Sequence, residues 1–517
     1  MADEPEKKQT TEAEKTERPF WDSGPGTPAL PGEPCRTPPH PDWSDNEKWV
    51  WSSICVGKSA DFNWRYGKKI DPKKDELWTE EEKERRKLSS RFLETILLDE
   101  RWRSAVPRNG VIIHGAWFGE PVDLDNARIE IDLSLCNCRF EHEVILNDCY
   151  TVFPLLLAGS AIVGTLEMDR AEIVGGLLME GGRFGEVQLG GARIRGHLDM
   201  EKAELSGRLF VDHVEIGCDL LMNCGRFAEV RLFGAAIKGQ LTMIEAAFSG
   251  ELKLQRAIVG TEFLMRAAIF EKPVTAIFCE VGSFLDMSGA KFKSGLDLTG
   301  TKVDAFLCGS KDEIPELKLN RFTYNHLGGL GWGGPGEQMT DRDAKWFVKW
   351  LARQKEYSPQ PYEQCAKVLR EAGQPGKANA VLYAGRERER ESAKNWRQKV
   401  WLTLLKKIIG YGLGWRQFFV AGWALGLALL GLLVASAAPE FSQHSWGWWL
   451  AFSVDKMIPF VDLSSDHSFK ALHGIWRGYF FFIHQLVGSV LIFLCDSRAY
   501  RDNREEVLGN RVFRGVV

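Results

Sequence analysis

The sequence lacks the short motifs by which many enzymes are recognised. It has no Gly-x-Ser-x-Gly, no His-Glu-x-x-His and no phosphate-binding loop. Its 11 cysteines include no Cys-x-x-Cys, and the closest pair, Cys136 and Cys138, has no neighbours that could complete a metal site. We therefore predict no catalytic residues, no cofactor and no metal site. The sequence by itself names no reaction.

The chain also lacks a strong charge of either sign. Its formal net charge is −4 and its pI is near 6.3, which gives no reason to expect nucleic acid as a partner. The N-terminus has no apolar core and is not a secretory signal. Residues 1–41 are charged and then proline-rich, so we predict a disordered tail. Most cysteines are expected to be small buried residues in a reducing compartment.

What the sequence does contain is a repeat. Units of the form Ala-x-Ile-x-Gly-x-Leu-x-Met recur, for example at 171–179 and 192–200. A lead apolar residue returns every ten to twelve residues, at Phe118, Ile129, Phe140, Val152, Ile162, Ile173, Phe184, Ile194, Leu205, Ile216, Phe227, Ile237, Phe248, Ile258, Phe270, Val281 and Phe292. A fixed short period is the signature of a solenoid.

The repeat predicts a β-solenoid because the apolar residues of each unit alternate, as in Leu198-x-Met200. We expect the glycine between the lead residue and this pair to mark a bend with positive φ. Two units would form a coil of roughly 22 residues, giving roughly eight coils spaced about 4.8 Å apart. The predicted fold is a right-handed, pentapeptide-repeat-like β-helix over residues 109–310, with α-helical caps and two C-terminal transmembrane helices.

Residues 42–108 carry helical signals and are predicted to cap the N-terminal end of the solenoid. Ser44 is placed to cap a short helix. Thr79 and Glu82 form a capping-box pattern ahead of one amphipathic segment. Its apolar residues are Leu88, Phe92, Leu93, Ile96 and Leu97. A solenoid end exposes unpaired strand edges, so this segment is our candidate lid.

Residues 311–340 are glycine-rich and are predicted to be a flexible linker. A literal Gly-x-Gly-x-x-Gly beginning at Gly329 lacks the βαβ context of a dinucleotide site. Residues 341–412 are predicted to be helical, with a helix pair joined by the turn Gly373–Gly376. The pair resembles a single tetratricopeptide-like unit, so peptide binding is an alternative to capping the far end of the solenoid.

Residues 413–497 are predicted to form a membrane domain. Two apolar segments, 418–438 and 478–495, approach the length that crosses a bilayer, and 446–460 is expected to be interfacial or re-entrant. Residues 498–517 form a basic tail. Positive charge concentrates before the first span and after the second, and little of it lies between them. This asymmetry predicts that both termini and the solenoid are cytoplasmic. The flanking basic residues are Arg397, Lys399, Lys406, Lys407, Arg416, Arg498, Arg501, Arg504, Arg511 and Arg514.

The candidate site residues lie in this membrane domain. His484 and Gln485 fall inside the second span, where polar side chains are costly and often functional, and Asp455 and Asp462 belong to the intervening segment. A role in snorkelling or helix pairing competes with a role as a proton or ligand site. The order span, short apolar segment, span also suggests a pore module, but residues 453–462 contain no glycine, which a potassium-type filter would need.

Gly422 and Gly426 have the spacing of closely packed membrane helices, which predicts helix packing and a homo-oligomer.

Several stretches elsewhere in the chain match those of a known protein family. The matching stretches are Ala60-Asp-Phe-Asn63, Leu88–Leu98, Gly115-Ala-Trp-Phe118, the Gly-x-Leu-x-Met units, Pro361-Tyr-Glu-Gln364, Gly410-Tyr-Gly412 and Met457–Asp462.

With these stretches, which cover nearly everything after Trp43, the chain resembles a family of uncharacterised bacterial membrane proteins with pentapeptide-repeat-like β-helices. The resemblance implies multi-pass insertion in the bacterial inner membrane and no particular substrate. Members of the family are sometimes labelled membrane-associated oxidoreductases, a function that no motif in these residues supports.

The expected function is therefore a binding or scaffolding module: a solenoid anchored to the lipid bilayer, with a protein partner on its outer surface. An oligomeric membrane effector or channel gated by the solenoid is the first alternative. A membrane-associated oxidoreductase is the second.

Overall fold

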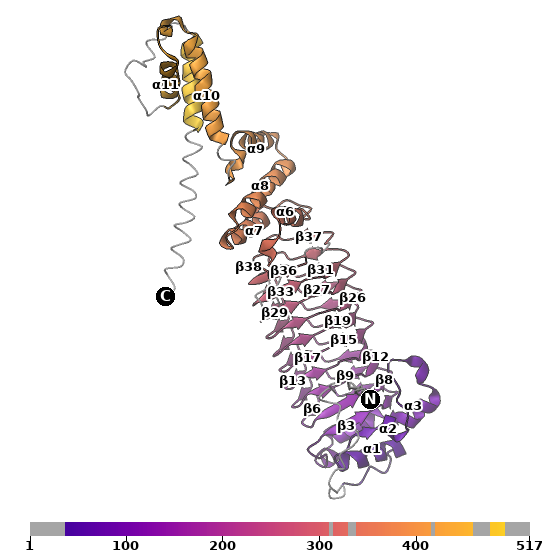
Figure 1. The fold of residues 1–517 in the computed structure, drawn as a ribbon. Helices are drawn as coiled ribbons and strands as arrows, with labels where there is room; N and C mark the ends of the chain where they lie inside the picture. The colour runs from indigo at the N-terminus through magenta and orange to yellow at the C-terminus, as the bar shows by residue number, and fades with distance from the viewer. Residues whose placement is uncertain (1–36, 310–313, 329–337, 415–418, 459–475, 492–517) are drawn as a thin grey trace, which may run out of the picture. The chain divides into compact units, whose positions relative to one another are not determined.

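The computed structural model describes residues 37–309, 314–328, 338–414, 419–458 and 476–491. The chain divides into two compact units, residues 1–221 and 222–517, and each is described by itself. Between them they hold a β-solenoid of about ten turns, followed by C-terminal helices (Figure 1). The predicted β-solenoid is confirmed.

Each coil contributes short parallel strands to three sheets, and equivalent residues are 21 or 22 positions apart, as in Leu177 with Leu198 and Ile162 with Phe184. In the first unit, sheet A holds β1 (Ala60–Asp61), β3 (Val111–His114), β7 (Leu133–Cys136), β11 (Leu155–Leu156), β14 (Leu177–Leu178), β17 (Leu198–Asp199) and β21 (Leu220–Leu221). Sheet C holds β6 (Arg128–Ile129), β10 (Tyr150–Thr151), β13 (Glu172–Ile173), β16 (Arg193–Ile194) and β20 (Glu215–Ile216).

Sheet B runs as two ladders, which share the long strands β12 (Ala161–Glu167) and β15 (Arg183–Gln188). Its other strands in the first unit are β2 (Lys87–Leu88), β4 (Trp117–Phe118), β5 (Val122–Asp123), β8 (Arg139–Phe140), β9 (Val144–Ile145), β18 (Glu204–Leu205) and β19 (Leu209–Phe210). Each coil therefore passes through four strand positions.

The second unit continues the same three kinds of sheet. Its sheet A strands are β25 (Leu241–Thr242), β29 (Glu262–Leu264), β33 (Phe284–Met287), β36 (Ala305–Cys308) and β38 (His326–Leu327), and its sheet C strands are β24 (Ala236–Ile237), β28 (Ile258–Val259) and β32 (Glu280–Val281). Its sheet B strands are β22 (Arg226–Phe227), β23 (Val230–Arg231), β26 (Ala247–Phe248), β27 (Leu252–Lys253), β30 (Ile269–Phe270), β31 (Val274–Thr275), β34 (Lys291–Phe292), β35 (Leu296–Asp297) and β37 (Leu317–Lys318).

The expected number of coils was too small, because strands extend beyond both ends of the repeat. β1 and β2 come from the predicted N-terminal cap and pair with β3 and β4. β37 and β38 lie in the segment predicted to be a linker and pair with β35 and β36. Their sequences lack the full repeat, but an exposed ladder edge offers backbone hydrogen bonds to any extended segment that reaches it.

The interior is filled by columns of identical or similar side chains. In the second unit the rings of Phe227, Phe248, Phe270 and Phe292 stack with centroids 4.9–5.3 Å apart. These rings are buried, as are the aliphatic residues of the other columns. Burial of one such side chain contributes about 1.5–3 kcal/mol, and it requires the neighbouring coil as a cover.

The repeat glycines do not have the predicted role. Gly196 and Gly217 have no positive φ. A Cβ at Gly196 would lie 2.8 Å from the carbonyl oxygen of Gly175, and one at Gly217 would lie under 3.0 Å from that of Arg195. Glycine is therefore needed at this corner because the backbone of the preceding coil lies against it.

Positive φ occurs instead at the corner after each Leu-x-Met pair. There Arg170 has a φ of 57°, Ala171 N–H donates to Met168 O at 3.2 Å, and Arg170 N–H donates to Gly190 O of the next coil at 2.9 Å. A β-turn with positive φ at its third residue explains this conformation. The equivalent non-glycine residues are Asn126, Asn137, Asp148, Lys202, His213, Cys224, Glu245, Arg256, Ala267, Phe278 and Arg321.

Helices cover the N-terminal end of the first unit. They are α1 (Asp45–Cys55), α2 (Phe62–Arg65), α3 (Glu80–Arg86), α4 (Ser90–Leu98) and α5 (Glu100–Arg103), with a 3₁₀ turn η1 (Asp75–Leu77). Ser44 caps α1, as predicted, and it forms a capping box with Glu47. α4 contacts β5 and β6 and buries Phe92, Leu93, Ile96 and Leu97. It is the lid of the first coils.

Two details of this region differ from the prediction. The single helix expected after Thr79 is divided into α3 and α4 by β2, because Lys87 and Leu88 pair with β4 instead of continuing the helix. The tail is ordered in part. Thr37 O accepts a hydrogen bond from Trp51 Nε1 at 3.0 Å, while residues 1–36 lie outside the described residues.

The second unit ends its coils against helices. These are α6 (Ala344–Leu351), α7 (Pro359–Glu371), α8 (Pro375–Ser392) and α9 (Trp396–Ile409), with the 3₁₀ turns η2 (Met339–Asp341) and η3 (Gly410–Gly412). Gln360 Nε2 donates to Phe322 O at 3.2 Å, and Trp350 packs beside Phe306 with centroids 5.7 Å apart. The helix pair α7–α8 is as predicted, and α7 contacts β38.

Three further helices follow, namely α10 (Phe419–Ser436), α11 (Trp446–Met457) and a helix at 476–491, with a 3₁₀ turn η5 (Pro439–Phe441). Among the described residues, α10 alone is long and apolar enough to cross a membrane, judged by length and composition. It has 18 residues, few of which are buried within the described structure. The second span, 478–495, stays a prediction, and its last residues lie outside the described ones.

Mutation can distinguish a glycine required by close backbone packing from one at a corner with positive φ. We expect Gly217→Ala to lower the free energy of unfolding by about 1–3 kcal/mol, because its Cβ would enter the backbone of the preceding coil. Gly181 has a φ of 64°, and a Cβ there would meet no atom within 4 Å, so Gly181→Asn should cost about 1 kcal/mol or less. Thermal or denaturant unfolding of both variants measures the difference; equal costs would contradict this assignment of the two corners.

Candidate functional site

A buried polar cluster lies where α10, α11 and the helix at 476–491 meet. Ser453 Oγ donates a hydrogen bond to Ala428 O at 2.8 Å. His484 Nε2 lies 3.1 Å from Leu427 O and 3.4 Å from Ser453 Oγ. Both side chains are buried, with His484 only 2% exposed. The cluster connects all three helices by polar contacts.

Aromatic side chains surround the cluster. Phe452 packs edge-to-face on Phe481 at 5.1 Å, and Phe481 lies 5.6 Å from the His484 ring. Ala435 and Phe441 complete the same apolar core. His484 Nδ1 is buried and has no hydrogen-bond partner among the described residues. An unsatisfied buried nitrogen is costly in apolar surroundings, so His484 is a candidate functional residue.

A small residue makes this approach of the helices possible. A Cβ at Gly431 of α10 would lie 2.8 Å from His484 Nε2 and closer still to Ser453 Oγ. A Cβ at Gly488 would likewise lie too close to the carbonyl oxygen of Met457. These two glycines, rather than Gly422 and Gly426, allow the helices to pack.

Gly422 and Gly426 are exposed, and a Cβ at either would meet no atom within 4 Å. They therefore make no close helix contact within this chain. The buried residues of α10 are Ala428, Gly431 and Ala435, whose spacing places them on one face. Self-association through Gly422 and Gly426 stays a prediction.

The other predicted site residues are dispersed. Asp455 is 4% exposed and lies 3.3 Å from Lys456 Nζ in an ion pair. Gln485 is half-buried, and its carbonyl accepts a hydrogen bond from Ser489 Oγ at 2.7 Å. Asp462 lies outside the described residues. Sequence reasoning missed Ser453, although a serine on an apolar helix next to Asp455 was a signal that could have found it.

The cluster does not have the geometry of an activated serine. Ser453 donates its proton to a backbone carbonyl, whereas a serine nucleophile donates it to the histidine that acts as base. The hydroxyl proton and the imidazole tautomer are assigned from this hydrogen-bond pattern. The arrangement therefore stabilises helix packing.

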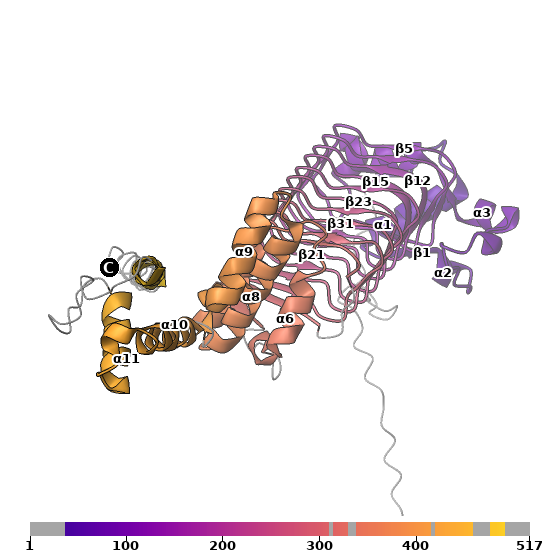
Figure 2. The same ribbon diagram turned by 90° about the horizontal axis from the view of Figure 1, so that it is seen from above.

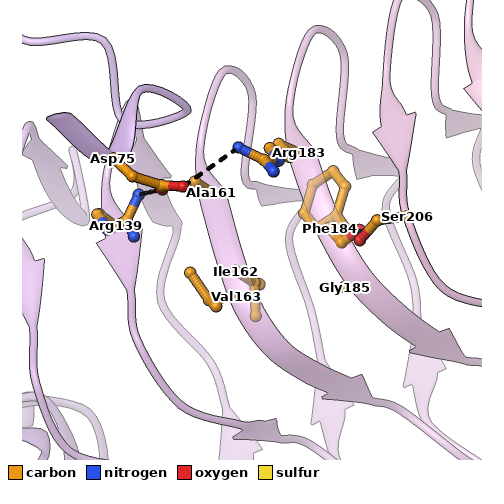
Figure 3. Close-up of a pocket in the computed structure, with 9 residues that line it drawn as sticks. All are labelled: Asp75, Arg139, Ala161, Ile162, Val163, Arg183, Phe184, Gly185 and Ser206. Carbon is orange, nitrogen blue, oxygen red and sulfur yellow. Dashed lines mark hydrogen bonds and ion pairs between the residues drawn. The ribbon is translucent and has the colours of Figure 1, made fainter.

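The first unit has a small hollow on sheet B, where the loop before η1 meets the coils (Figure 3). Arg139 Nη1 donates to Asp75 Oδ1 and to Pro72 O, both at 2.8 Å, and Arg183 Nη1 donates to Lys73 O at 2.8 Å. The cavity volume is about 70 Å³. Small-molecule sites typically enclose about 300–1,000 Å³, so this one fits a few waters.

The arginines of this hollow hold the loop in place. Arg139 also bonds Glu141 at 2.8 Å. Burial lowers the pKa of Arg139, but its bonds to Glu141 and Asp75 outweigh burial and leave the pKa above its ordinary value. The guanidinium is thus committed to internal partners. The residues that line the hollow therefore attach the N-terminal loop to the coils through hydrogen bonds.

A second charged group lies in the N-terminal helices. Arg86 is fully buried and bonds Glu82, Asn63 and the carbonyl oxygen of Gly115. Burial raises the pKa of Glu82, but bonds from Lys68 and Arg86 outweigh burial, so the pKa is lowered. Each charge is paired, as a buried ion pair requires. This group fastens the cap to the first coil.

Most of the free cysteines in the described part of the chain are buried. Burial raises the pKa of Cys149 and Cys279 to about 12, so both thiols stay protonated and weakly nucleophilic. Cys136 and Cys138 are also buried and free, and Cys55 is disulfide-bonded. Over the described residues, no three His, Cys, Asp or Glu side chains are grouped to hold a metal ion.

Comparison of the chain with known protein families, curated proteins and solved structures finds no match. The site must therefore be interpreted from its own geometry.

The contrast between Gly431 and Gly426 provides a test of this packing. Gly431→Leu would place a side chain on Ser453 and His484, so we expect it to lower the thermal stability of the detergent-purified protein by several degrees, for a cost of about 1–3 kcal/mol. Gly426→Leu has open space and should leave the melting temperature unchanged.

The same pair of variants tests the self-association prediction. If Gly426 packs against a second copy, Gly426→Leu should reduce the apparent mass in size-exclusion chromatography with light scattering while stability is retained. Equal melting temperatures for wild type, Gly431→Leu and Gly426→Leu would contradict the three-helix packing.

Proposed function

We propose that the protein is a membrane-anchored scaffold whose solenoid binds a protein partner on its outer faces. The observation that carries the proposal is the sealed interior of the coils. Phe, Ile, Leu and Met side chains fill it, and most of them are 0–2% exposed. A ligand can therefore reach only outward-facing side chains, which suit a broad protein surface better than a small substrate.

The outward-facing side chains support recognition because they are charged and regularly spaced. Along the side of the coils that carries sheet C, Arg195 pairs with Glu172 at 2.5 Å, and Lys302 pairs with Glu280 at 2.8 Å. These pairs join residues of successive coils. Exposed ion pairs contribute little to stability, roughly 0–1 kcal/mol, so their value lies in specificity of association.

Anchoring at a bilayer is part of the proposal. α10 has the composition of a span, and its outward residues are large and apolar. The exposed ones include Trp423, Leu425, Leu429, Leu430 and Leu433. In the helix at 476–491, Phe482, Ile483 and Leu486 are also exposed, which favours a second span. A bacterial inner membrane, cytoplasmic coils and membership of the pentapeptide-repeat-like family belong to the same proposal.

Site-specific crosslinking tests the scaffold. A photoreactive amino acid is placed in the full chain at one outward position of each sheet in the first unit: Leu178 on sheet A, Gln188 on sheet B and Glu215 on sheet C. We expect a discrete protein adduct from one of these faces in cells that express the chain at its natural level.

Charge exchange provides the matched control for sheet C. Glu172→Arg together with Arg195→Glu preserves the ion pair and should preserve the fold, but it reverses the pattern that a partner would recognise. Loss of a sheet C adduct in this variant, with unchanged unfolding, supports the scaffold. Absence of an adduct at all three positions contradicts it.

The second candidate function is an oligomeric membrane effector or channel. It is favoured by the buried Ser453–His484 contact and the Asp455–Lys456 pair, since polar groups within membrane helices often belong to ion or proton pathways. The purified protein in liposomes should then conduct ions, and His484→Phe should change the conductance. Liposomes that stay impermeable, while the protein is shown to be inserted, remove this candidate.

A further inference from the structure

The helix α9 exposes an apolar face that the fold leaves uncovered. Trp396 is 70% exposed, Trp401 57%, Val400 49% and Leu404 46%. At 100° per residue, these four side chains lie within an arc of about 140° on one side of the helix, which the long side chains of Arg397 and Lys407 share. Two tryptophans on one exposed face are unusual in a water-facing helix and typical of the membrane–water interface.

The opposite side of α9 is held by α8, so the apolar face has a fixed direction within the second unit. Leu402 and Ile409 are buried. Lys406 Nζ lies 2.7 Å from Glu387, whose other oxygen accepts a hydrogen bond from Tyr411 at 2.6 Å. Figure 2 shows the two helices side by side, and they are in contact.

The charge of this segment is of one sign. From Lys394 to Ile409 it carries five cations and no carboxylate. Arg397, Lys399 and Lys407 are exposed, and Arg397 lies over the Trp396 ring at 5.8 Å. A basic helix with an aromatic apolar face has the two properties that bind an anionic lipid surface: apolar area to bury and charge to neutralise phosphate headgroups.

The position of α9 along the chain also favours a lipid surface. It ends at Ile409, ten residues before α10 begins at Phe419, and the two helices are in contact. Ten residues extend over at most about 35 Å. If α10 crosses a bilayer, α9 cannot leave the neighbourhood of that bilayer surface.

We propose that α9 is an interfacial helix that docks its Trp396–Leu404 face into a bilayer containing anionic phospholipid. This inference rests on the proposed anchoring by α10. Docking orients the helices that cap the last coil of the second unit with respect to the lipid. It adds a lipid-dependent contact to what would otherwise be a simple tether.

Fluorescence of a single label tests the docked face. The full chain carries Val400→Cys with an environment-sensitive fluorophore, with the other accessible cysteines replaced by serine, in nanodiscs of phosphatidylcholine with or without phosphatidylglycerol. We expect quenching by a headgroup nitroxide lipid, and protection from aqueous iodide, when phosphatidylglycerol is present. Gln398→Cys is the matched control, because about 160° separate the two positions around the helix, so Gln398 should stay accessible to iodide.

A charge variant tests the anionic lipid. The triple change Arg397→Gln, Lys399→Gln and Lys407→Gln should lower the ratio of docked to undocked helix about fivefold for each cation removed. The difference between the two lipid compositions should then disappear. An unchanged response to phosphatidylglycerol in this variant would overturn the electrostatic part of the proposal.

Two other outcomes would overturn the proposal as a whole. Iodide access to position 400 in both lipid compositions means that the face is not docked. Protection that persists in detergent and depends on protein concentration means that a second copy covers it. Flotation after alkaline carbonate treatment separates these outcomes from failure of the anchor: protein that floats but exposes position 400 refutes only the α9 inference, whereas protein that does not float refutes the proposed membrane function.

Discussion

Coil-on-coil stacking is the constraint on which the rest of this structure depends. A single coil cannot cover its own inward side chains, so the column of Phe248, Phe270 and Phe292 is stable only because each ring is covered by the next. The same stacking lets backbone N–H groups of one coil donate hydrogen bonds to carbonyl oxygens of the next. It also forces glycine at Gly196 and Gly217, where one coil lies directly against another.

An architecture that gains its stability from neighbours is least stable at its ends. In the first unit α4 covers the early coils and Arg86 fastens the cap by bonding the Gly115 carbonyl. In the second unit Gln360 and Trp350 hold the helices against the last strands. Arg86 and Gln360 are polar side chains that join elements at these ends, since each one bonds a backbone carbonyl of the coils.

The sequence allowed the solenoid and its helical caps to be predicted, but several details were wrong. Positive φ falls at Arg170 rather than at the repeat glycines. The backbone at this corner is held by a hydrogen bond to the next coil, so residues other than glycine can occupy it. The site was predicted only in part. His484 was recognised as a polar residue inside an apolar segment. Its contact with Ser453, which the sequence did not indicate, joins helices across a separation of 31 residues.

The sequence by itself determined the period, the inward and outward sides of each strand and the apolar character of α10, because these properties depend on residue spacing and composition alone. Only the tertiary structure decided which glycines permit close packing, which strands extend the ladders at β1 and β38, and which face of α9 stays uncovered. Those features depend on distances between segments that are remote in the chain, and local periodicity carries no information about them.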